Sequence, residues 1–459
     1  MSRISLIALQ NPKQEKQKAR ELMAMGYDAR LRLKDAGLDG ILHSARPQEL
    51  DRLVKNGRDL SFEDAFRGMC FALAATNRQF FEICWGADRD SSHALREQAL
   101  AVGTSFMQLM SVKEAVRNLT SAEIAGMTAA VLADTVFRFD VPRVIETCGM
   151  GGDRGFGAGI AAVTKTINAS TLSALVLSSL GLPTIKHGSY ANTSAVGSTD
   201  VVERFGARTS MTSAAEVRRI WSESGFCFFD AHWCRTIHDL SHLLMMETIN
   251  HVVGPMAAPV SSETLVNKVM GVNHKVHPAS VAHAYAVLHL RGIQKVGSVV
   301  VLGGLDEGGY RIDHRDEEAF REHCILDEVS PFTTLCSVIH DGHFRGTFML
   351  SPNDFGISLD PQKIKLPNRS DVVQRGNISA LRGEREELGK YLAMNASIGL
   401  FAERYVGVKK DAFVGRRFNR EYLKECYREC LGAIADGRAW RKLERYVEAT
   451  GGTISLCDN

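Results

Sequence analysis

The feature that most restricts the fold of this chain is a repeated order of apolar segment, glycine-bearing loop and helix. In the first unit, the apolar segment 141–147 leads into a loop in which residues 146–159 include six glycines, and the helical pattern 170–181 follows. In the second unit, an apolar segment at 183–186 precedes another glycine-bearing loop and the helical pattern 199–206. Parallel strands need a crossover connection, usually a helix. The order therefore predicts an α/β fold with a mostly parallel sheet flanked by helices.

The remaining segments place helices on both sides of this region in the sequence. Residues 46–135 carry apolar side chains at helical spacing, and a helical pattern returns from Glu387 onward. Between them, 226–229 and 296–304 have the composition of strands, and 277–292 has that of a helix. We therefore expect a separate all-helical domain before the sheet and a helical extension after it, on the surface or in a dimer contact.

Composition excludes several classes of protein. With 45% apolar residues, 24% charged residues and a net charge of +2, the 459-residue chain is typical of a globular protein without a general attraction to nucleic acid or membranes. No stretch is apolar enough for a membrane span or a signal peptide. The ten cysteines form no C-x-x-C pair, which argues against structural zinc and a disulfide framework. We expect a cytoplasmic protein.

The glycine-rich loop indicates a phosphate site, since glycines between a strand and a helix let backbone N–H groups approach a phosphate. Two familiar phosphate motifs do not fit. The dinucleotide pattern G-x-G-x-x-G has Arg154 where its last glycine belongs, and the P-loop pattern has Thr164 where a glycine precedes the lysine. A flexible turn without a ligand remains an alternative for the loop alone.

Polar side chains downstream favour a ligand site over a simple turn. They stand at the starts of the next two helices and at the end of a strand, and these positions share one edge of an open parallel sheet, where ligands bind. The residues concerned are Thr166, Asn168, Ser170, Thr171, Lys186, Ser194, Gly197 and Ser198.

Three of these segments together resemble a known family. GMGGD (149–153), TINAST (166–171) and IKHGSYANTSAVGSTDVVERFG (185–206) are similar to the core signature of the anthranilate phosphoribosyltransferase family, within the wider group that includes pyrimidine nucleoside phosphorylases. The resemblance extends to INHVVGPMAAP (249–259), where His251 replaces an asparagine. It implies a homodimer. It also implies a helical domain of residues 1–138 joined in space by about 238–262, an α/β donor-binding domain of 139–237 and 263–404, and a helical C-terminal extension of 405–459.

The resemblance implies an enzyme of the pentosyltransferase class. Such an enzyme moves phosphoribose from phosphoribosyl diphosphate to a small acceptor and releases pyrophosphate, and no side chain is expected to act as a catalytic nucleophile. The residues that it implies for binding the donor are Gly149, Gly151, Gly152, Asp153, Thr166, Asn168, Ser170, Thr171, Lys186, Gly188, Thr193, Ser194 and Ser198.

The family also binds magnesium through an adjacent Asp-Glu pair, because Mg²⁺ prefers oxygen ligands. The sequence offers Asp306-Glu307 and Asp327-Glu328. The second pair has the family's DE-hydrophobic-S continuation, and Asp354 follows Asp327 at the offset of the family pattern. We therefore expect Asp327 and Glu328, with Ser170, to bind Mg²⁺. Residues 308–325 then form an insertion before the pair.

The departures from the family pattern lie on the acceptor side. Met150 replaces a threonine, and Ser189 and Tyr190 replace an asparagine and an arginine. The family's arginine for the acceptor carboxylate is absent at Ser241 or Leu243. We therefore expect an aromatic or heterocyclic acceptor other than anthranilate. Further insertions at 154–163 and at the C-terminus have no assigned role.

Two other functions remain open at this stage. A nucleoside phosphorylase would use a similar loop with free phosphate, and a non-catalytic relative would bind nucleic acid or another ligand in the inherited cleft; nucleic acid is disfavoured because no strong basic stripe is present. His187 is expected to orient other groups rather than catalyse. Cys148 is expected to be a buried filler at a strand end.

Overall fold

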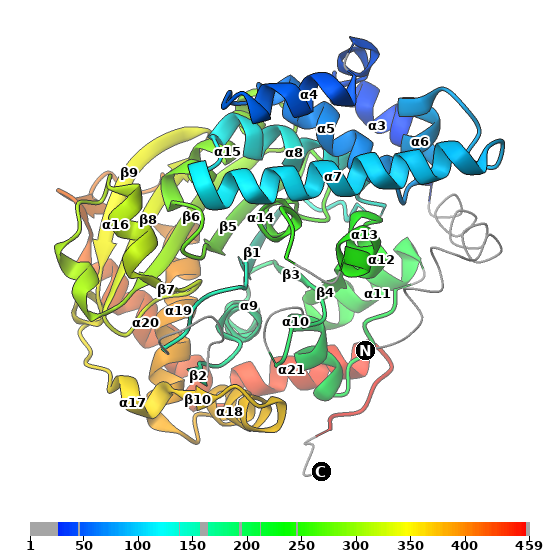
Figure 1. Ribbon diagram of the computed structural model, residues 1–459. Coiled ribbons are helices and arrows are strands. Elements are labelled where there is room, and N and C mark those ends of the chain that lie inside the picture. Colours follow the sequence, from blue (N-terminus) through cyan, green and yellow to red (C-terminus); the bar gives the residue numbers. More distant parts are fainter. Residues whose placement is uncertain are drawn as a thin grey trace.

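The computed structural model describes residues 26–44, 46–136, 138–156, 164–191, 195–211, 213–244 and 247–455. In these ranges one large sheet lies between two groups of helices (Figure 1). No helix in the described part of the chain is long and apolar enough to cross a membrane.

The sheet confirms the predicted α/β architecture. Its order is β4-β3-β1-β5-β6-β8-β9, with β7 also paired to β6. The strands from β4 to β6 are parallel, whereas β7, β8 and β9 are antiparallel to their neighbours. The sheet is therefore mostly parallel, with an antiparallel edge. The strands are β1 Arg143–Gly149, β3 Thr184–Gly188, β4 Phe226–Asp230, β5 Leu265–Gly271, β6 Val296–Leu305, β7 Cys324–Leu326, β8 Thr333–His340 and β9 His343–Leu350.

The N-terminal helices form the layer at the top of Figure 1. Thr120 begins the last of them with a capping box, in which its side chain accepts from the Glu123 amide and the Glu123 side chain accepts in return. The helices are α3 Ala29–Asp35, α4 Pro47–Lys55, α5 Phe62–Ala74, α6 Arg78–Trp85, α7 His93–Arg117 and α8 Ser121–Asp134, with the 3₁₀ segment η1 Asp39–Ser44. Later segments that pack in the same apolar cluster are α13 Ile237–Leu244, α14 Asn250–Met256 and α15 Pro278–Leu290.

The other side of the sheet is covered by helices from the middle and the end of the chain. They are α9 Ala169–Ser179, α10 Ser198–Arg204, α11 Ala214–Ser224, α18 Ser370–Arg382, α19 Glu386–Arg404, α20 Arg420–Ala435 and α21 Arg438–Ala449. Shorter elements are α12 Ala231–Cys234, η2 Glu307–Arg311, α16 Glu317–His323, η3 Pro352–Phe355 and α17 Pro361–Ile364, with the strand pairs β2 Thr164–Lys165 to β10 Leu366–Pro367 and β11 Phe413–Val414 to β12 Arg417–Phe418.

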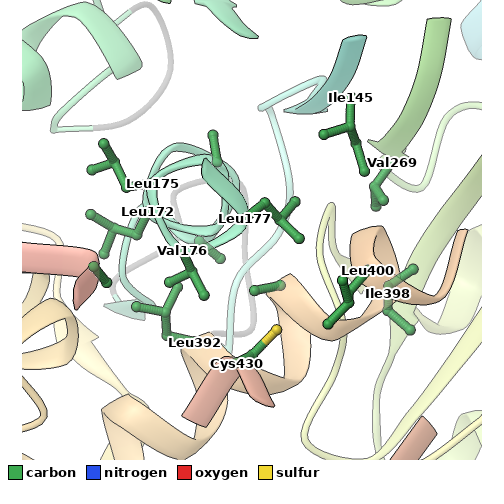
Figure 2. Packing of buried hydrophobic residues seen from close by; sticks show 14 of the residues in the cluster. Ile145, Leu172, Leu175, Val176, Leu177, Val269, Leu392, Ile398, Leu400 and Cys430 are labelled. Atoms are coloured by element: carbon green, nitrogen blue, oxygen red, sulfur yellow. The ribbon is translucent and has the colours of Figure 1, made fainter. Parts of the chain in front are cut away.

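Helix α9 lies at the centre of this second layer, and apolar residues surround it. Figure 2 shows Leu172, Leu175, Val176 and Leu177 pointing outward from α9 in several directions, toward side chains of α19, α20 and the strands. A Cβ atom at Gly399 of α19 would lie 2.6 Å from Leu177 Cδ1, so the glycine permits the close contact. The start of α9, next to the glycine loop, is thereby held in place.

The C-terminal helices belong to this core. Leu423, Cys430, Leu443 and Tyr446 of α20 and α21 are all buried in the cluster that contains α9 and the sheet. The prediction of a surface tail is wrong for α20 and α21, because their apolar faces complete the layer that covers the parallel strands. A role in dimer contacts stays a prediction.

The packing predicts a large effect for Leu177→Ala. The side chain is fully buried between α9, β1 and α19, so truncation should lower the free energy of unfolding by about 2–5 kcal/mol. Urea denaturation measures the change. Leu31→Ala, at a side chain that is 54% exposed, is the control and should change stability by less than about 0.5 kcal/mol. Equal effects of the two changes would contradict this description of the core.

Candidate active site

A cavity of about 260 Å³ lies at the carboxyl ends of β1 and β3. The glycine loop, the starts of α9 and α10, and part of α14 form its walls. The structure brings most of the predicted site residues together there: Gly149, Met150, Gly151, Gly152, Asp153, Thr166, Asn168, Ser170, Lys186, Gly188, Ser189, Tyr190, Ser198, Asp327 and Glu328.

One predicted residue within the described part of the chain does not line the cavity. Thr171 is buried behind the wall, where its hydroxyl donates to Ser198 Oγ at 3.2 Å. It therefore supports Ser198 from behind. Thr193 and Ser194 lie outside the described residues, as does most of the 154–163 insertion.

The glycines at the ends of β1 and β5 make room for Asp327. A Cβ atom at Gly149 would lie 2.4 Å from Asp327 Oδ2, and one at Gly271 would lie 1.5 Å from the Asp327 carbonyl oxygen. Gly151, with a φ of +71°, donates its N–H to Asp327 Oδ2 at 2.6 Å. The bare backbone of this loop thus brings an acidic side chain against two strand ends.

Burial raises the pKa values of the acidic pair. Burial, with the neighbouring Asp153, raises the pKa of Asp327 to about 6. Burial, with the adjacent Asp327, raises the pKa of Glu328 to about 8. The hydroxyls of Thr166 and Tyr391 both donate to Glu328 Oε1, the latter at 2.9 Å. Two partly buried carboxyl groups thus lie side by side in the cavity wall, where a cation would favour their ionised forms.

The other acidic pair is placed differently. Asp306 Oδ1 accepts the N–H groups of Gly308 and Gly309 at 2.9 and 3.0 Å, and lies 2.8 Å from His323 Nδ1. Neither Asp306 nor Glu307 lines the cavity. The pair caps the η2 turn, which supports the choice of Asp327 and Glu328 as the metal site.

Two lysines border the donor side. Lys186 is 2% exposed, and its Nζ donates to the carbonyl of His187 while it lines the cavity; burial lowers its pKa. Lys165 donates to the side chain of Asp153 and to its carbonyl oxygen, the latter at 3.2 Å. Lys165 was not among the predicted site residues, although it directly follows Thr164, which ruled out the P-loop pattern.

His187 and Cys148 have the arrangement expected of supporting residues. His187 Nδ1 contacts Glu146 Oε1, and its Nε2 lies 3.1 Å from the Gly254 carbonyl oxygen, so protein oxygens face both ring nitrogens. Burial lowers the pKa of His187 to about 4. Burial also raises the pKa of the Cys148 thiol, which donates to the Pro255 carbonyl.

Asn168 is tied to a partner that the sequence did not reveal. Its backbone N–H donates to Asn377 Oδ1 at 2.8 Å, and Asn377 Nδ2 donates to Asn168 Oδ1 at 3.0 Å. Asn168 Nδ2 donates to the Val196 carbonyl at 3.2 Å. The side chain therefore joins the α9 start to α18 and to the loop before α10. No local motif marks Asn377, which is 209 residues away.

The acceptor side holds no exposed guanidinium among the described lining residues. The hydroxyl of Ser241, one of the two positions at which the family's arginine is expected, lies 3.3 Å from the Thr248 hydroxyl. Arg235 lines the cavity, but its Nη1 donates to Gly254 O at 2.8 Å, and its Nη2 is buried without a partner. The Tyr190 hydroxyl donates to Glu203 at 2.8 Å. The wall is thus polar and aromatic.

His251 forms another part of this wall. Its Nε2 lies 2.9 Å from Glu114 Oε1 and its Nδ1 lies 3.0 Å from Glu247 Oε1. Burial lowers the pKa of His251, but the two carboxylates outweigh burial and the net pKa is raised. A Cβ atom at Gly152 would lie 2.6 Å from Glu247 Oε1, so this group also packs against the glycine loop.

The two insertions touch each other. Arg154 Nη1 donates to the Glu322 carbonyl at 2.8 Å, and the Gly155 N–H donates to the Ile325 carbonyl at 2.9 Å. Arg321 Nη1 donates to the Ala115 carbonyl of α7 at 2.7 Å. The 308–325 insertion therefore connects the glycine loop with the N-terminal helical layer.

Comparison with known proteins identifies the family. Residues 141–310 match the family model described as "Glycosyl transferase family, a/b domain". The chain is 34% identical over 379 residues to the anthranilate phosphoribosyltransferase of Sorangium cellulosum, covering 80% of this chain and 93% of that protein. The chain belongs to the anthranilate phosphoribosyltransferase family. It is accordingly an enzyme, a phosphoribosyltransferase of the pentosyltransferase class, as the resemblance implied.

More distant members of the anthranilate phosphoribosyltransferase family agree. The enzyme of Methanococcus maripaludis strain C6 is 27% identical over 332 residues, covering 72% of this chain and 86% of that protein. The structure of the Saccharomyces cerevisiae enzyme in complex with PRPP and Mg has a TM-score of 0.62 at 21% identity, covering 88% of this chain and 96% of that chain. The Thermus thermophilus enzyme has a TM-score of 0.60 at 22% identity, covering 88% of this chain and 99% of that chain. The solved structures support the fold.

The raised pKa of Glu328 predicts a pH-dependent stability. Without bound cations the folded protein keeps this proton up to about pH 8, whereas the unfolded chain releases it near pH 4.5, so the free energy of unfolding should fall as pH rises between these values. Glu328→Gln removes the titrating group. Urea denaturation with a chelator measures the free energy of unfolding at pH 5 and at pH 8. Between these pH values it should fall further in the wild type than in Glu328→Gln, by on the order of 2–4 kcal/mol. Equal falls in both proteins would contradict the assignment.

Proposed function

We propose that this enzyme transfers phosphoribose from phosphoribosyl diphosphate, with magnesium, to a small aromatic or heterocyclic acceptor that lacks the carboxylate of anthranilate, and releases pyrophosphate. The observation that carries the proposal is one cavity that holds a glycine loop, a buried ammonium group and two partly buried carboxyl groups. The first two suit an anionic donor, and the last suits a cation bound with it.

Donor binding is supported by the groups along one rim of the cavity. The start of α9 presents Ser170, and the positive end of the helix favours an anion there. Lys186 contributes a buried charge that a phosphate would compensate, and Ser198 adds a hydroxyl. The glycine loop contributes backbone amides. These residues would hold the diphosphate and the ribose phosphate without covalent bonding.

The residues present fit magnesium. Asp327 and Glu328 offer hard oxygen ligands, and burial together with neighbouring carboxyl groups raises their pKa values, so a bound cation would favour the ionised forms. Among the described residues no three Asp, Glu, His or Cys side chains already surround one point. This agrees with Mg²⁺, which commonly uses one or two carboxylates together with substrate phosphates. When bound, the ion supplies charge stabilisation for the leaving pyrophosphate.

The chain's own residues act by placement and electrostatics. Transfer at the ribose C1 passes through a cation-like sugar, so the enzyme must hold the acceptor nitrogen in line with the leaving oxygen and exclude water. Preorganised donors from the glycine loop, Lys186 and Ser170 would stabilise the charge that develops on pyrophosphate. Protein oxygens lie beside both ring nitrogens of His187. These contacts, with Glu146 and with the Gly254 carbonyl, favour an orienting role.

The acceptor wall supports a substrate without a carboxylate. Ser241 lies 3.3 Å from the Thr248 hydroxyl, and Arg235 is buried and donates Nη1 to the Gly254 carbonyl, which leaves only Nη2 without a partner among the described residues. His251 is held between two glutamates. A bound carboxylate would meet no bidentate partner and would lie near acidic groups, at a cost of about 1–3 kcal/mol or more.

Homodimer formation and cytoplasmic location stay predictions.

Donor binding gives the first test. Calorimetric titration of the wild type with phosphoribosyl diphosphate should show binding that tightens at least about tenfold with Mg²⁺, and Asp327→Asn with Glu328→Gln should remove the metal effect. The matched control is Asp306→Asn with Glu307→Gln, which should keep it. Binding of phosphate with a nucleoside instead would indicate a nucleoside phosphorylase. Failure to bind either would indicate a non-catalytic relative.

The acceptor is tested by pyrophosphate release. Purified enzyme with phosphoribosyl diphosphate and Mg²⁺ is supplied with anthranilate and with aromatic amines, heterocycles and phenols that lack a carboxylate. We expect kcat/KM for the best neutral acceptor to exceed that for anthranilate by at least about a hundredfold. This factor corresponds to the loss of one hydrogen bond to a charged group. A kcat/KM for anthranilate above that of every neutral acceptor would overturn the acceptor assignment.

A further inference from the structure

A fully buried ion cluster lies beneath the cavity, on three adjacent strands. Glu146, in the middle of β1, is 0% exposed and stands directly opposite Lys268 of β5 in the sheet register. Lys268 is also 0% exposed, and His187 of β3 lies on the other side of Glu146. Neither Glu146 nor Lys268 lines the cavity. The donor and metal sites described above make no use of these two residues.

The two oxygens of Glu146 divide their partners between the neighbouring strands. Oε1 accepts the backbone N–H of His187 at 3.2 Å and contacts the ring Nδ1. Oε2 accepts from Lys268 Nζ at 2.7 Å. Burial is the largest single effect on the pKa of Glu146 and raises it, but His187 and Lys268 together outweigh burial and the net pKa is lowered. Glu146 is therefore ionised and bridges β3 to β5.

The donors of this cluster hold the C-terminal end of α14. Lys268 Nζ also donates to the carbonyls of Pro255 and Met256, the latter at 3.4 Å. The Gly254 carbonyl accepts from Arg235 Nη1 at 2.8 Å and lies 3.1 Å from His187 Nε2. The last carbonyls of a helix lack the usual partners within the helix, so such donors supply bonds to them, while the Gly254 carbonyl also accepts the Ala257 N–H at 3.2 Å. Three consecutive carbonyls of α14 are bound from below in this way.

Helix α14 in turn forms part of the cavity wall. Asn250, His251, Gly254 and Pro255 all line the cavity, and we assign this wall to the acceptor. The distance between α14 and the sheet therefore sets the width of the cavity on the acceptor side. That distance depends on Lys268 and His187, and both of these residues are bound by Glu146.

We propose that Glu146 is a positioning residue that fixes the acceptor-side wall through Lys268, His187 and the carbonyl end of α14. The description of this wall as the acceptor side rests on the proposed function; the clamp itself does not. Without the Glu146 carboxylate, Lys268 would be a buried cation that has lost its hydrogen-bonded counter-charge, and such a group relieves its cost by moving toward water. The Pro255 and Met256 carbonyls that it holds would move with it.

Glu146→Gln tests the proposal, with two companion variants. The substitution keeps the shape and removes the charge. Glu123→Gln is the matched control, because Glu123 is equally buried and pairs with the buried Lys113, but lies in the N-terminal helical layer away from the cavity. Glu146→Gln with Lys268→Met removes both charges of the bridge, so it should regain thermal stability while still lacking the clamp.

Hydrogen exchange of residues 248–256 is the deciding readout. Each protein is measured at the same number of degrees below its own Tm. Residues 248–256 should then exchange at least about tenfold faster in Glu146→Gln and in the double variant than in the wild type, whereas Glu123→Gln should show no such acceleration. Unchanged exchange in Glu146→Gln, or equal acceleration in Glu123→Gln, overturns the proposal. Recovery of wild-type exchange in the double variant would also overturn it, since buried charge alone would then be the cause.

Kinetics separate this proposal from the proposed function. Calorimetry with phosphoribosyl diphosphate and Mg²⁺ should give a Kd within about threefold of wild type for Glu146→Gln, while the acceptor KM found in the pyrophosphate assay rises at least about tenfold. A donor Kd that weakens as much as the acceptor KM contradicts a role confined to the acceptor wall. If the wild type binds no donor, the proposed function fails, and the exchange experiment still decides the clamp.

Discussion

The close approach of the Asp327 segment to the ends of β1 and β5 is the constraint on which the site depends. Any side chain at Gly149 or Gly271 would occupy the space of Asp327 atoms. With Asp327 in this position, the Gly151 amide donates to its carboxylate, and Glu328 lies in the cavity wall beside Thr166 and Tyr391. The glycines therefore make room for an acidic pair as well as forming the loop that we propose for phosphate, and the proposed anion-binding and cation-binding groups line one cavity.

The sheet carries this arrangement because each of its faces is covered. On one face, α9 is buried on all sides and presents its start to the cavity, held by α19 and the C-terminal helices (Figure 2). On the other face, α14 and α15 connect the sheet with the N-terminal helices. The start of α9 therefore reaches the cavity from the first layer, and α14 reaches it from the second. The Glu146 cluster joins the two beneath the cavity floor.

Short sequence patterns predicted several of the residues that the structure places around the cavity. The glycine loop, Lys186 and the Asp327-Glu328 pair each stand at a strand end or helix start, and the alternation of strands and helices indicated the parallel sheet. Partners from distant segments were not predictable, since nothing in the sequence joins Asn377 to Asn168 or Glu146 to Lys268. The C-terminal helices were misplaced for the same reason: an amphipathic pattern shows that a helix packs, but not what it packs against.

The central claim is that one rim of the sheet binds the sugar diphosphate and its cation together. A crystal structure of the wild type with phosphoribosyl diphosphate and Mg²⁺ tests it most directly. The account predicts the diphosphate along the Gly149–Asp153 loop and the start of α9, within reach of Lys186, and the metal on Asp327 and Glu328. A donor bound outside this cavity, or a metal on Asp306 and Glu307 with the Asp327 carboxylate turned away, would contradict it.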